Sequence, residues 1–262
     1  MLWRLDHLRD FKLRATDGVL GSVVDVYFED QDWQVRWLVV DTAWLFGRRV
    51  LLAPPCLGRP NQAARELPVD LTQEKIKSAP DISTDRPVSR QHEANLYAHY
   101  AWPPYWAAGV DAWSAVPVPP AAYPLPGQPP AGTEAPLNPA LAEALAQEEA
   151  RQDPHLRSGR EIAGYHIAAA DGSLGHVEDL LVDDQGWRIR YLLVDTRNWL
   201  PGRDVLIAPA WVREIAWPER KVTVAMTQQQ IEDSPEYDPQ IGPGREYEGR
   251  LYRHYGQTIY WE

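Results

Sequence analysis

The stretch WQVRWLVVDT at 33–42 returns as WRIRYLLVDT at 187–196. Both copies run from a Trp to Val-Asp-Thr through branched and aromatic residues, which is typical of a long, buried β-strand. From Val35 to Val40 the strand is apolar on both faces except at Arg36, and Arg190 is its counterpart in the second copy. The pattern predicts the central strand of a β-rich unit, which meets solvent at the arginine.

The similarity of the two strands belongs to a much longer repeat. Asp-Gly at 17–18 matches Asp-Gly at 171–172 with an offset of 154, and after one inserted residue the offset becomes 155. The match continues to Tyr-Trp at 105–106 and 260–261. A single insertion over the whole alignment indicates the duplication of an entire domain.

Each copy predicts a mainly β fold. Five or six short strands with tight turns favour a small closed or nearly closed β-barrel. A short helix is expected after Thr72 and after Thr227, which are N-cap candidates. A second helix is expected at about 89–100 and 245–255.

The segment between the copies differs in composition from both. It is rich in Pro and Ala, which favours an extended linker, and Asn-Pro at 138–139 predicts a helix near 139–152. The predicted organisation is a first domain at 1–106, a linker at 107–157 and a second domain at 158–262.

The end of each copy carries an unusual number of aromatic residues. We expect each aromatic tail to pack on a barrel, its own or that of the sister domain, with partner docking and ligand stacking as alternatives. Within the tail helices an Arg–Glu pair recurs at i, i+3: Arg90 with Glu93, and Arg245 with Glu248. The aromatic candidates are Tyr97, Tyr100, Trp102, Tyr105, Trp106, Tyr252, Tyr255, Tyr260 and Trp261.

The ordered string D-G-x-L-G, W-x-[VI]-R-[WY]-L-[VL]-V-D-T and G-R-x-V-L-[LI]-A-P resembles the PRC-barrel domain, the small β-barrel of the photosynthetic reaction centre H subunit. The resemblance covers 3–106 and 157–262. It implies two homologous PRC-type barrels, each with a helical, aromatic-rich extension. It also implies an assembly or adaptor module without established chemistry. The membrane anchor of the H subunit has no counterpart in the sequence.

Composition narrows the classes of function. The net charge of −11 argues against a nucleic-acid binder, which needs a basic footprint. Cys56 is the single cysteine, so no intramolecular disulfide forms, and an inert thiol is expected there. No secretory signal or apolar run of membrane-spanning length is present, so a cytoplasmic protein is expected. Peripheral association with a membrane complex stays open.

Several recurring polar residues are candidates for a chemical site. Asp41 and Asp195 end the long strands, and paired carboxylates suit acid–base chemistry or cation binding, whereas turn capping is the structural alternative. His99 and His254 recur without a second ligand at i+3 or i+4, so a packing or hydrogen-bonding role is favoured. The unpaired histidines, His166 and His176 among them, form no cluster in the sequence. No catalytic, cofactor or metal site is predicted.

The sequence therefore favours a non-enzymatic scaffold or adaptor that binds an unidentified protein partner. Both a homodimer and an intramolecular pseudo-dimer about a pseudo-two-fold axis are compatible with the duplication. The alternatives are an accessory protein of membrane-associated, photosynthetic-type electron transfer, and a small-ligand binder or enzyme that uses the strand-end carboxylates.

Overall fold

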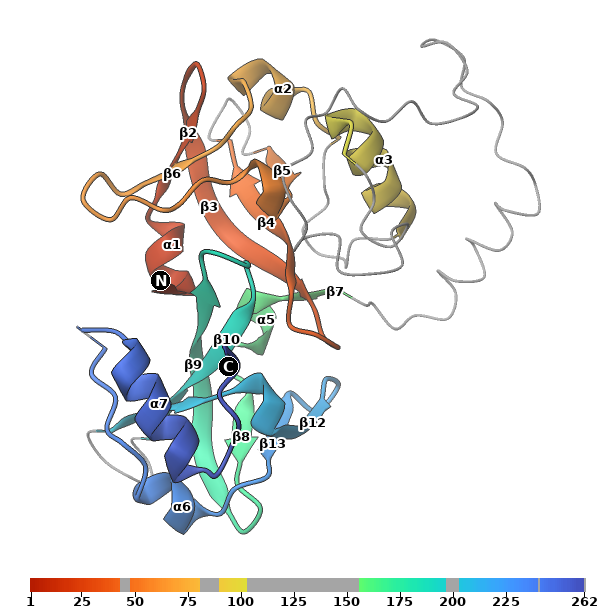
Figure 1. Ribbon diagram of the computed structural model, residues 1–262. Coiled ribbons are helices and arrows are strands. Elements are labelled where there is room, and N and C mark those ends of the chain that lie inside the picture. The colour runs from red at the N-terminus through yellow and green to blue at the C-terminus, as the bar shows by residue number, and fades with distance from the viewer. Residues whose placement is uncertain (43–47, 81–89, 103–155, 197–202, 240, 262) are drawn as a thin grey trace.

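A computed structural model describes residues 1–42, 48–80, 90–102, 156–196, 203–239 and 241–261. The described chain is mainly β and contains two separate mixed sheets, one in each copy of the repeat (Figure 1). We call residues 1–102 the first unit and residues 156–261 the second unit. The predicted linker helix near 139–152, together with Tyr105 and Trp106, lies outside the described residues.

The first unit builds a six-stranded sheet in the order β5-β4-β3-β2-β6, with β7 of the second unit added beside β3. Its elements are β1 (Leu2–Arg4), α1 (Leu5–Arg9), β2 (Lys12–Ala15), β3 (Gly18–Glu29), β4 (Val35–Asp41), β5 (Arg49–Leu52), the 3-10 turn η1 (Pro54–Cys56), β6 (Glu66–Pro68), α2 (Gln73–Lys77) and α3 (Arg90–Tyr100).

The second unit repeats this order as β11-β10-β9-β8-β13, followed by β12, with β1 of the first unit added beside β9. Its elements are β7 (Leu156–Ser158), α5 (Gly159–Ile162), β8 (His166–Ala168), β9 (Ser173–Asp183), β10 (Ile189–Asp195), β11 (Asp204–Ile207), η3 (Pro209–Trp211), β12 (Val212–Ala216), β13 (Lys221–Val224), α6 (Gln228–Glu232) and α7 (Arg245–His254).

Local sequence signals account for much of this order. Asp17-Gly18 turns β2 into β3, as predicted. Thr72 Oγ1 accepts a hydrogen bond from Lys75 N at 3.2 Å, and Thr227 forms a capping box with Gln230, so both predicted N-caps are confirmed. Within the described ranges no strand pair closes either sheet into a barrel, so the predicted closure is not observed.

Each unit gives its first strand to the other unit's sheet. β1 pairs antiparallel with β9, with Trp3 opposite Val182, and β7 pairs antiparallel with β3, with Arg157 opposite Phe28. The two pairings are equivalent, because Trp3 and Phe28 become Arg157 and Val182 at the repeat offset of 154. The exchange relates the units by a pseudo-two-fold axis, and Figure 1 shows β7 at the lower end of β3, where the first unit meets the second.

A second reciprocal contact joins the units near the start of the long strands. Val35 N donates to Trp187 O at 2.8 Å, and Ile189 N donates to Trp33 O at 2.9 Å. Between them Gln34 forms an antiparallel bridge with Arg188, its own counterpart in the repeat. The buried apolar residues of both units form one continuous cluster across this contact.

Two glycines of the repeat are required by close approach of the backbone. Gly21 and Gly175 adopt φ of 59° and 139°, and a Cβ on either would lie 1.9 Å from the carbonyl oxygen of Asp41 or Asp195. No side chain fits at that distance, so the glycine of D-G-x-L-G lets β3 and β9 pack against the ends of β4 and β10.

The units differ where the first lacks a counterpart of β12. In the second unit β12 pairs with β13 from Val212 to Ala216. The equivalent residues of the first unit, 57–61, keep only the end bridges Leu57 to Val69 and Asn61 to Glu66. Gly58 and Pro60 lie between these bridges, and proline has no N–H to donate to a ladder.

The sequence pattern predicted that Arg36 meets solvent, and this prediction is wrong. Arg36 is 9% exposed, and its guanidinium donates to Glu29 Oε2 at 2.8 and 2.6 Å and to Asp32 at 3.0 Å. The strand therefore stays buried on both faces, because carboxylates next to its turn neutralise the arginine.

Candidate functional site

The tail helix of each unit presents a buried glutamate to the central strand. Glu93 on α3 is fully buried, and its Oε1 accepts a hydrogen bond from Trp37 Nε1 on β4 at 2.8 Å. The side chain of Arg90, its predicted i, i+3 partner, lies outside the described side chains.

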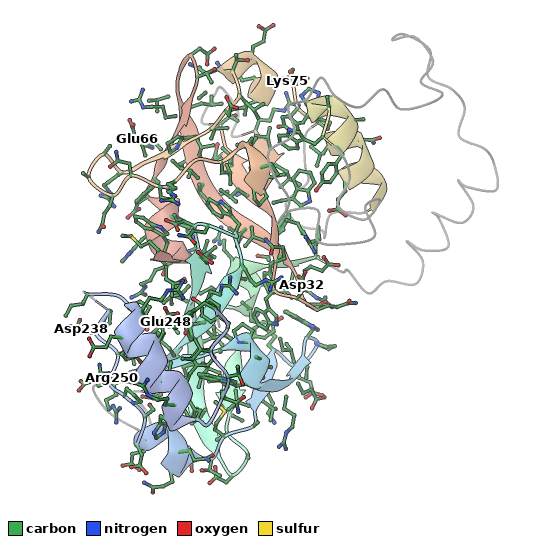
Figure 2. The ribbon with its side chains drawn as sticks, viewed as in Figure 1. Asp32, Glu66, Lys75, Asp238, Glu248 and Arg250 are labelled. Atoms are coloured by element: carbon green, nitrogen blue, oxygen red, sulfur yellow. The ribbon has the colours of Figure 1, made fainter. Side chains whose placement is uncertain are left out.

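Glu248 holds the equivalent place on α7 (Figure 2). Its Oε1 accepts from Tyr191 OH and from Tyr260 OH, both at 2.9 Å, and its Oε2 lies 3.6 Å from Arg245 Nη1. The predicted Arg–Glu pair is thus formed here. Burial raises the pKa of Glu248, and the two tyrosine hydroxyls oppose that rise. The arrangement ties the tail to the sheet and leaves the carboxylate without access for a substrate.

The aromatic tails pack on the sheet of their own unit. Tyr97 meets Trp37 edge-on at 5.1 Å between ring centroids, and Trp102 stacks on Tyr100 at 4.3 Å. The tail of the second unit is arranged around Tyr252, which is 5% exposed. Its ring neighbours are Trp211, Tyr260 and Trp261. Of the two packing alternatives, the described aromatics follow the one within the same unit.

The recurring histidines hold the tail helix against the short helix before it. His99 Nε2 lies 3.1 Å from the carbonyl oxygen of Lys75, and His254 Nε2 lies 2.6 Å from that of Gln230. Since a carbonyl only accepts, Nε2 is the donor in both units. The two histidines therefore have the same structural contact and face separate helices.

Asp41 and Asp195 lie at equivalent strand ends but have different neighbours. Asp41 lies opposite Arg49 on β5, whereas Asp195 lies opposite Asp204 on β11. The repeat therefore does not present one catalytic or ligand-binding arrangement twice at these carboxylates.

Asp25 is a further recurring carboxylate, and it joins the two units. It is 8% exposed, and its carboxylate accepts from Ser158 Oγ at 2.5 Å and from Arg160 N at 3.0 Å. It thus binds the start of α5, directly after the exchanged strand β7. Burial raises the pKa of Asp25, and the hydrogen bonds oppose that rise.

Asp179 makes the reciprocal contact with α1. Its Oδ2 accepts from Arg4 Nε at 3.0 Å and from Asp6 N at 3.4 Å. Arg4 and Asp6 are the repeat counterparts of Ser158 and Arg160. We call Asp25 and Asp179 with these partners the two latches. The sequence showed that the two aspartates recur but not what they bind, because each partner comes from the other unit.

Asp30 and Asp184 reinforce the exchange at its other end. Arg157 Nε donates to Asp30 Oδ2 at 3.0 Å. On the other side of the axis, Trp3 Nε1 donates to Asp184 Oδ2 at 3.0 Å, and the amino group of Met1 lies 2.5 Å from Asp184 Oδ1. Each exchanged strand is therefore fixed by carboxylates of the sheet that receives it.

Cys56 lies in η1 beneath the tail of the first unit. Its Sγ donates to Ala53 O at 3.1 Å, and burial raises the pKa of the thiol. A buried thiol with a raised pKa is a poor nucleophile at neutral pH.

His166 and His176, which formed no cluster in the sequence, lie opposite each other on β8 and β9. Their ring centroids are 5.7 Å apart, and Ser173 Oγ lies 3.3 Å from His166 Nε2. The first unit has Lys12 opposite Ser22 at the same place. Among the described residues no group of three or more His, Cys, Asp or Glu side chains is placed to hold a metal ion.

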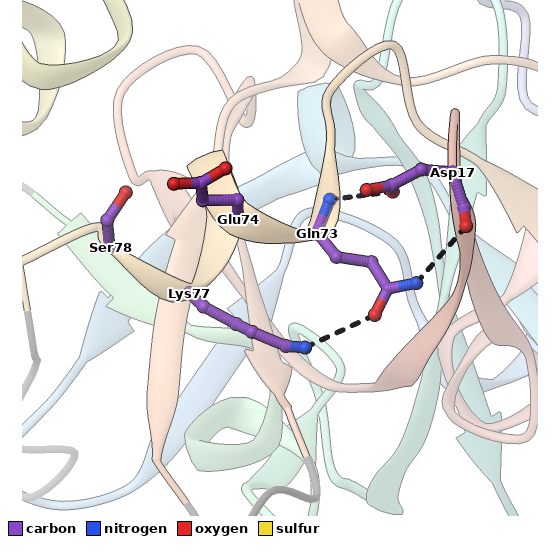
Figure 3. Close-up of a pocket in the computed structure, with 5 residues that line it drawn as sticks. All are labelled: Asp17, Gln73, Glu74, Lys77 and Ser78. Atoms are coloured by element: carbon purple, nitrogen blue, oxygen red, sulfur yellow. Dashed lines mark hydrogen bonds between the residues drawn. The ribbon is translucent and has the colours of Figure 1, made fainter.

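Two hollows lie on the surface that the described residues form, and neither joins the candidate residues to each other. The first is an open hollow beside α2, lined by Asp17, Gln73, Glu74, Lys77 and Ser78. Figure 3 shows that three of these residues bond to one another: Gln73 N donates to Asp17 Oδ1 at 2.8 Å, and Lys77 Nζ donates to Gln73 Oε1 at 3.2 Å.

The second hollow lies where the turn of the first unit meets β12. Its lining residues are Asp30, Gln31, Trp33, Pro209, Val212, Arg213, Glu214, Ile215 and Trp217. Asp41, Asp195, His99 and His254 line neither hollow.

Comparison with protein families finds no match to this chain. Comparison with curated proteins likewise finds none. In the part of the chain that the structure describes, no helix has the length and apolar character needed to cross a bilayer.

Proposed function

We propose that this chain is a non-enzymatic scaffold or adaptor that uses two PRC-barrel-type modules for protein–protein interaction. The observation that carries the proposal is the reciprocal exchange of β1 and β7, which holds the two modules in one fixed relation. A protein that only needed two binding modules has no use for such a connection, since a flexible linker suffices to increase avidity. A fixed relation suits the placement of two bound partners at a set distance.

The use of the recurring polar residues supports the same function. The recurring carboxylates and histidines form hydrogen bonds with other elements of the fold. Glu248 binds the central strand, His99 binds the short helix, and Asp25 binds the segment after the exchanged strand. The repeat preserves contacts that maintain shape.

The two modules present equivalent outer faces with different charges. Across β8 and β9 the face of the second unit carries His166 and His176, and the first unit carries Lys12 and Ser22 there. We infer that the two modules bind different partners on similar surfaces, because charged rims select among partners.

The test is crosslinking capture from the native cell with the full chain as bait. H166K/H176S gives the second face the residues of the first, and K12H/S22H is the matched control that gives the first face those of the second. We expect a near-stoichiometric partner crosslinked to the second unit to be lost with H166K/H176S and kept with K12H/S22H. Recovery of respiratory or photosynthetic subunits by the same route would identify the scaffold as an accessory of electron transfer.

An enzymatic role makes the opposite prediction. A turnover catalysed by the purified chain and abolished by D41N/D195N, with the fold intact by circular dichroism, would overturn the proposal. Absence of any captured partner that depends on either face would also count against it.

A further inference from the structure

The pseudo-two-fold axis passes through two places where a residue meets its own counterpart in the repeat. At one, Gln34 pairs with Arg188. At the other, Leu5 at the start of α1 packs on Gly159 at the start of α5. A residue that meets its own counterpart at such an axis decides whether identical units can pair there.

Leu5 fills the space that Gly159 leaves. Leu5 is 1% exposed, and a Cβ on Gly159 would lie 2.7 Å from Leu5 Cδ2, 2.9 Å from Val26 Cγ2 and 3.4 Å from Leu180 Cδ1. Val26 and Leu180 are themselves counterparts in the repeat, so the four residues surround the axis as two pairs. One pair is strongly unequal in size.

We propose that Leu5 and Gly159, together with Gln34 and Arg188, make the first unit pair with the second and prevent either unit from pairing with a copy of itself. The contact surface of the first unit fits the second unit, and it does not fit another copy of the first unit. The same holds in reverse for the second unit. The proposal concerns pairing alone and is tested independently of the proposed scaffold function.

Two copies of the first unit would overpack the axis. Leu5 would face Leu5 where it now faces Gly159, which adds four side-chain carbons, while valine in place of Leu180 removes only one. Interiors are packed too closely to accept three additional carbons without displaced side chains.

Two copies of the second unit would fail in the opposite sense. Gly159 would face Gly159 and leave a cavity where the side chain of Leu5 now lies. At the other crossing Arg188 would face Arg188, and like charges across a strand pair are destabilising. Gln34 removes this repulsion in the native pairing.

The size complementarity is tested in the full chain by exchanging the two residues. L5G and G159L should each lower the Tm by at least about 5 °C, through a cavity and through overpacking respectively. The double variant L5G/G159L restores the unequal pair in reverse and should recover at least half of the summed loss. G159A serves if G159L does not fold, and it should be less harmful in the L5G background than alone. Strictly additive losses would overturn the proposed selection by size.

The charge complementarity has a parallel test. Q34R places two arginines at the axis and should lower the Tm more at low salt than at high salt, because screening weakens the repulsion. Q34R/R188Q should return the Tm and its salt dependence to those of the native chain. Equal Tm loss at both salt concentrations, or no recovery in the double variant, would contradict the role given to Gln34.

Selectivity itself is measured with two tagged versions of the full chain. Each carries a protease site within 107–137. One has a His tag on the first unit, and the other has a Strep tag on the first unit and a FLAG tag on the second unit. After cleavage and mixing, capture on the His tag should recover the FLAG-tagged second unit and no Strep-tagged first unit. Recovery of the Strep-tagged first unit, or dissociation of all halves after cleavage, would overturn the inference.

Discussion

At the scale of single residues, an indole contacts the equivalent tyrosine in each unit but comes from a different segment of the chain. In the first unit Trp102, from the end of the tail, lies 4.3 Å from Tyr100 between ring centroids. In the second unit Trp211, from η3, lies 4.8 Å from the equivalent Tyr255. In the repeat, Cys56 is the counterpart of Trp211, and Gln257 is the counterpart of Trp102. In each unit an indole therefore contacts this tyrosine, and a different part of the repeat supplies it.

The different origins of Trp102 and Trp211 predict that two substitutions in the first unit compensate for each other. W102Q should lower the free energy of unfolding by about 2 kcal/mol, because it removes most of a partly buried aromatic side chain. C56W alone should also destabilise the protein, since Trp102 already occupies the space beside Tyr100. In C56W/W102Q the new indole should occupy the place of Trp102 and recover part of the loss. Urea titration of the four proteins measures the coupling, and Q257A is the control, which should change little.

The latch at Asp25 predicts a pH dependence of stability. Burial raises its pKa in the folded protein, so its contribution to stability is fully present below the unfolded pKa and is lost as pH rises through the folded pKa. D25N keeps an acceptor for the backbone N–H groups and has no ionisation. We therefore expect the stability of the native chain relative to D25N to fall as the pH rises above about 4, the usual pKa of an aspartate. Urea midpoints at several pH values measure this difference, and a constant difference would contradict it.

The sequence predicted contacts between residues that are close along the chain and did not predict contacts between distant ones. Thr72 and Thr227 were identified because a cap binds an N–H three residues away. The contact of Asp25 was not, because Ser158 lies 133 positions further on. The prediction that Arg36 meets solvent is wrong, since alternation alone does not identify its partners, Glu29 at the end of β3 and Asp32 in the turn that follows.

At the scale of elements, the last residues of the chain stabilise α7 on its sheet. Truncation after Tyr255 removes Tyr260 and Trp261 and leaves Glu248 with one fewer hydrogen-bond donor. We expect the free energy of unfolding to fall by about 2–4 kcal/mol through lost aromatic burial and a poorly satisfied buried carboxylate. Thermal and urea unfolding measure the loss. Y260F, which keeps the ring and removes the hydroxyl, should cost about 1 kcal/mol.

An unchanged melting temperature after truncation would show that the tail does not stabilise the sheet. The matched position of the first unit, Tyr105, lies outside the described residues, so the second unit is the place for this test.

The elements that the sequence predicted are those with local signals. The Asp-Gly hairpin, the helices after the two threonines and the tail helices at 90–100 and 245–254 appear where periodicity and capping placed them. The exchanged strands β1 and β7 were not identified, because each has only three residues and its partner belongs to the other unit. The predicted boundary between 157 and 158 falls inside β7 for the same reason.

At the scale of the whole molecule, the reciprocal exchange uses the surface that pairs the first unit with the second within one chain. We expect a monomer of 29.8 kDa whose mass by light scattering does not change with concentration. The physical reason is that joining both units in one chain gives each a local concentration of its partner far above that of other molecules. A mass that rises toward twice this value at micromolar concentrations would show a further interface.

The sequence alone predicted the duplication, but it did not predict how the two units are arranged relative to each other. Repeats at a fixed offset reveal that two domains share a fold. Their arrangement depends on which backbone groups each domain leaves unpaired, and the open side of each sheet beside β3 or β9 is visible only in three dimensions.

The pairing of β7 with β3 also has a consequence for synthesis on the ribosome. Residues of the first sheet emerge well before the strand that completes it, with 127 positions separating Asp30 from Arg157. At cellular rates of translation this is a delay on the order of ten seconds, during which the edge of β3 stays exposed to other nascent chains. A chaperone that shields this edge during elongation should raise the yield of native protein, and slow codons between 103 and 155 should lower it.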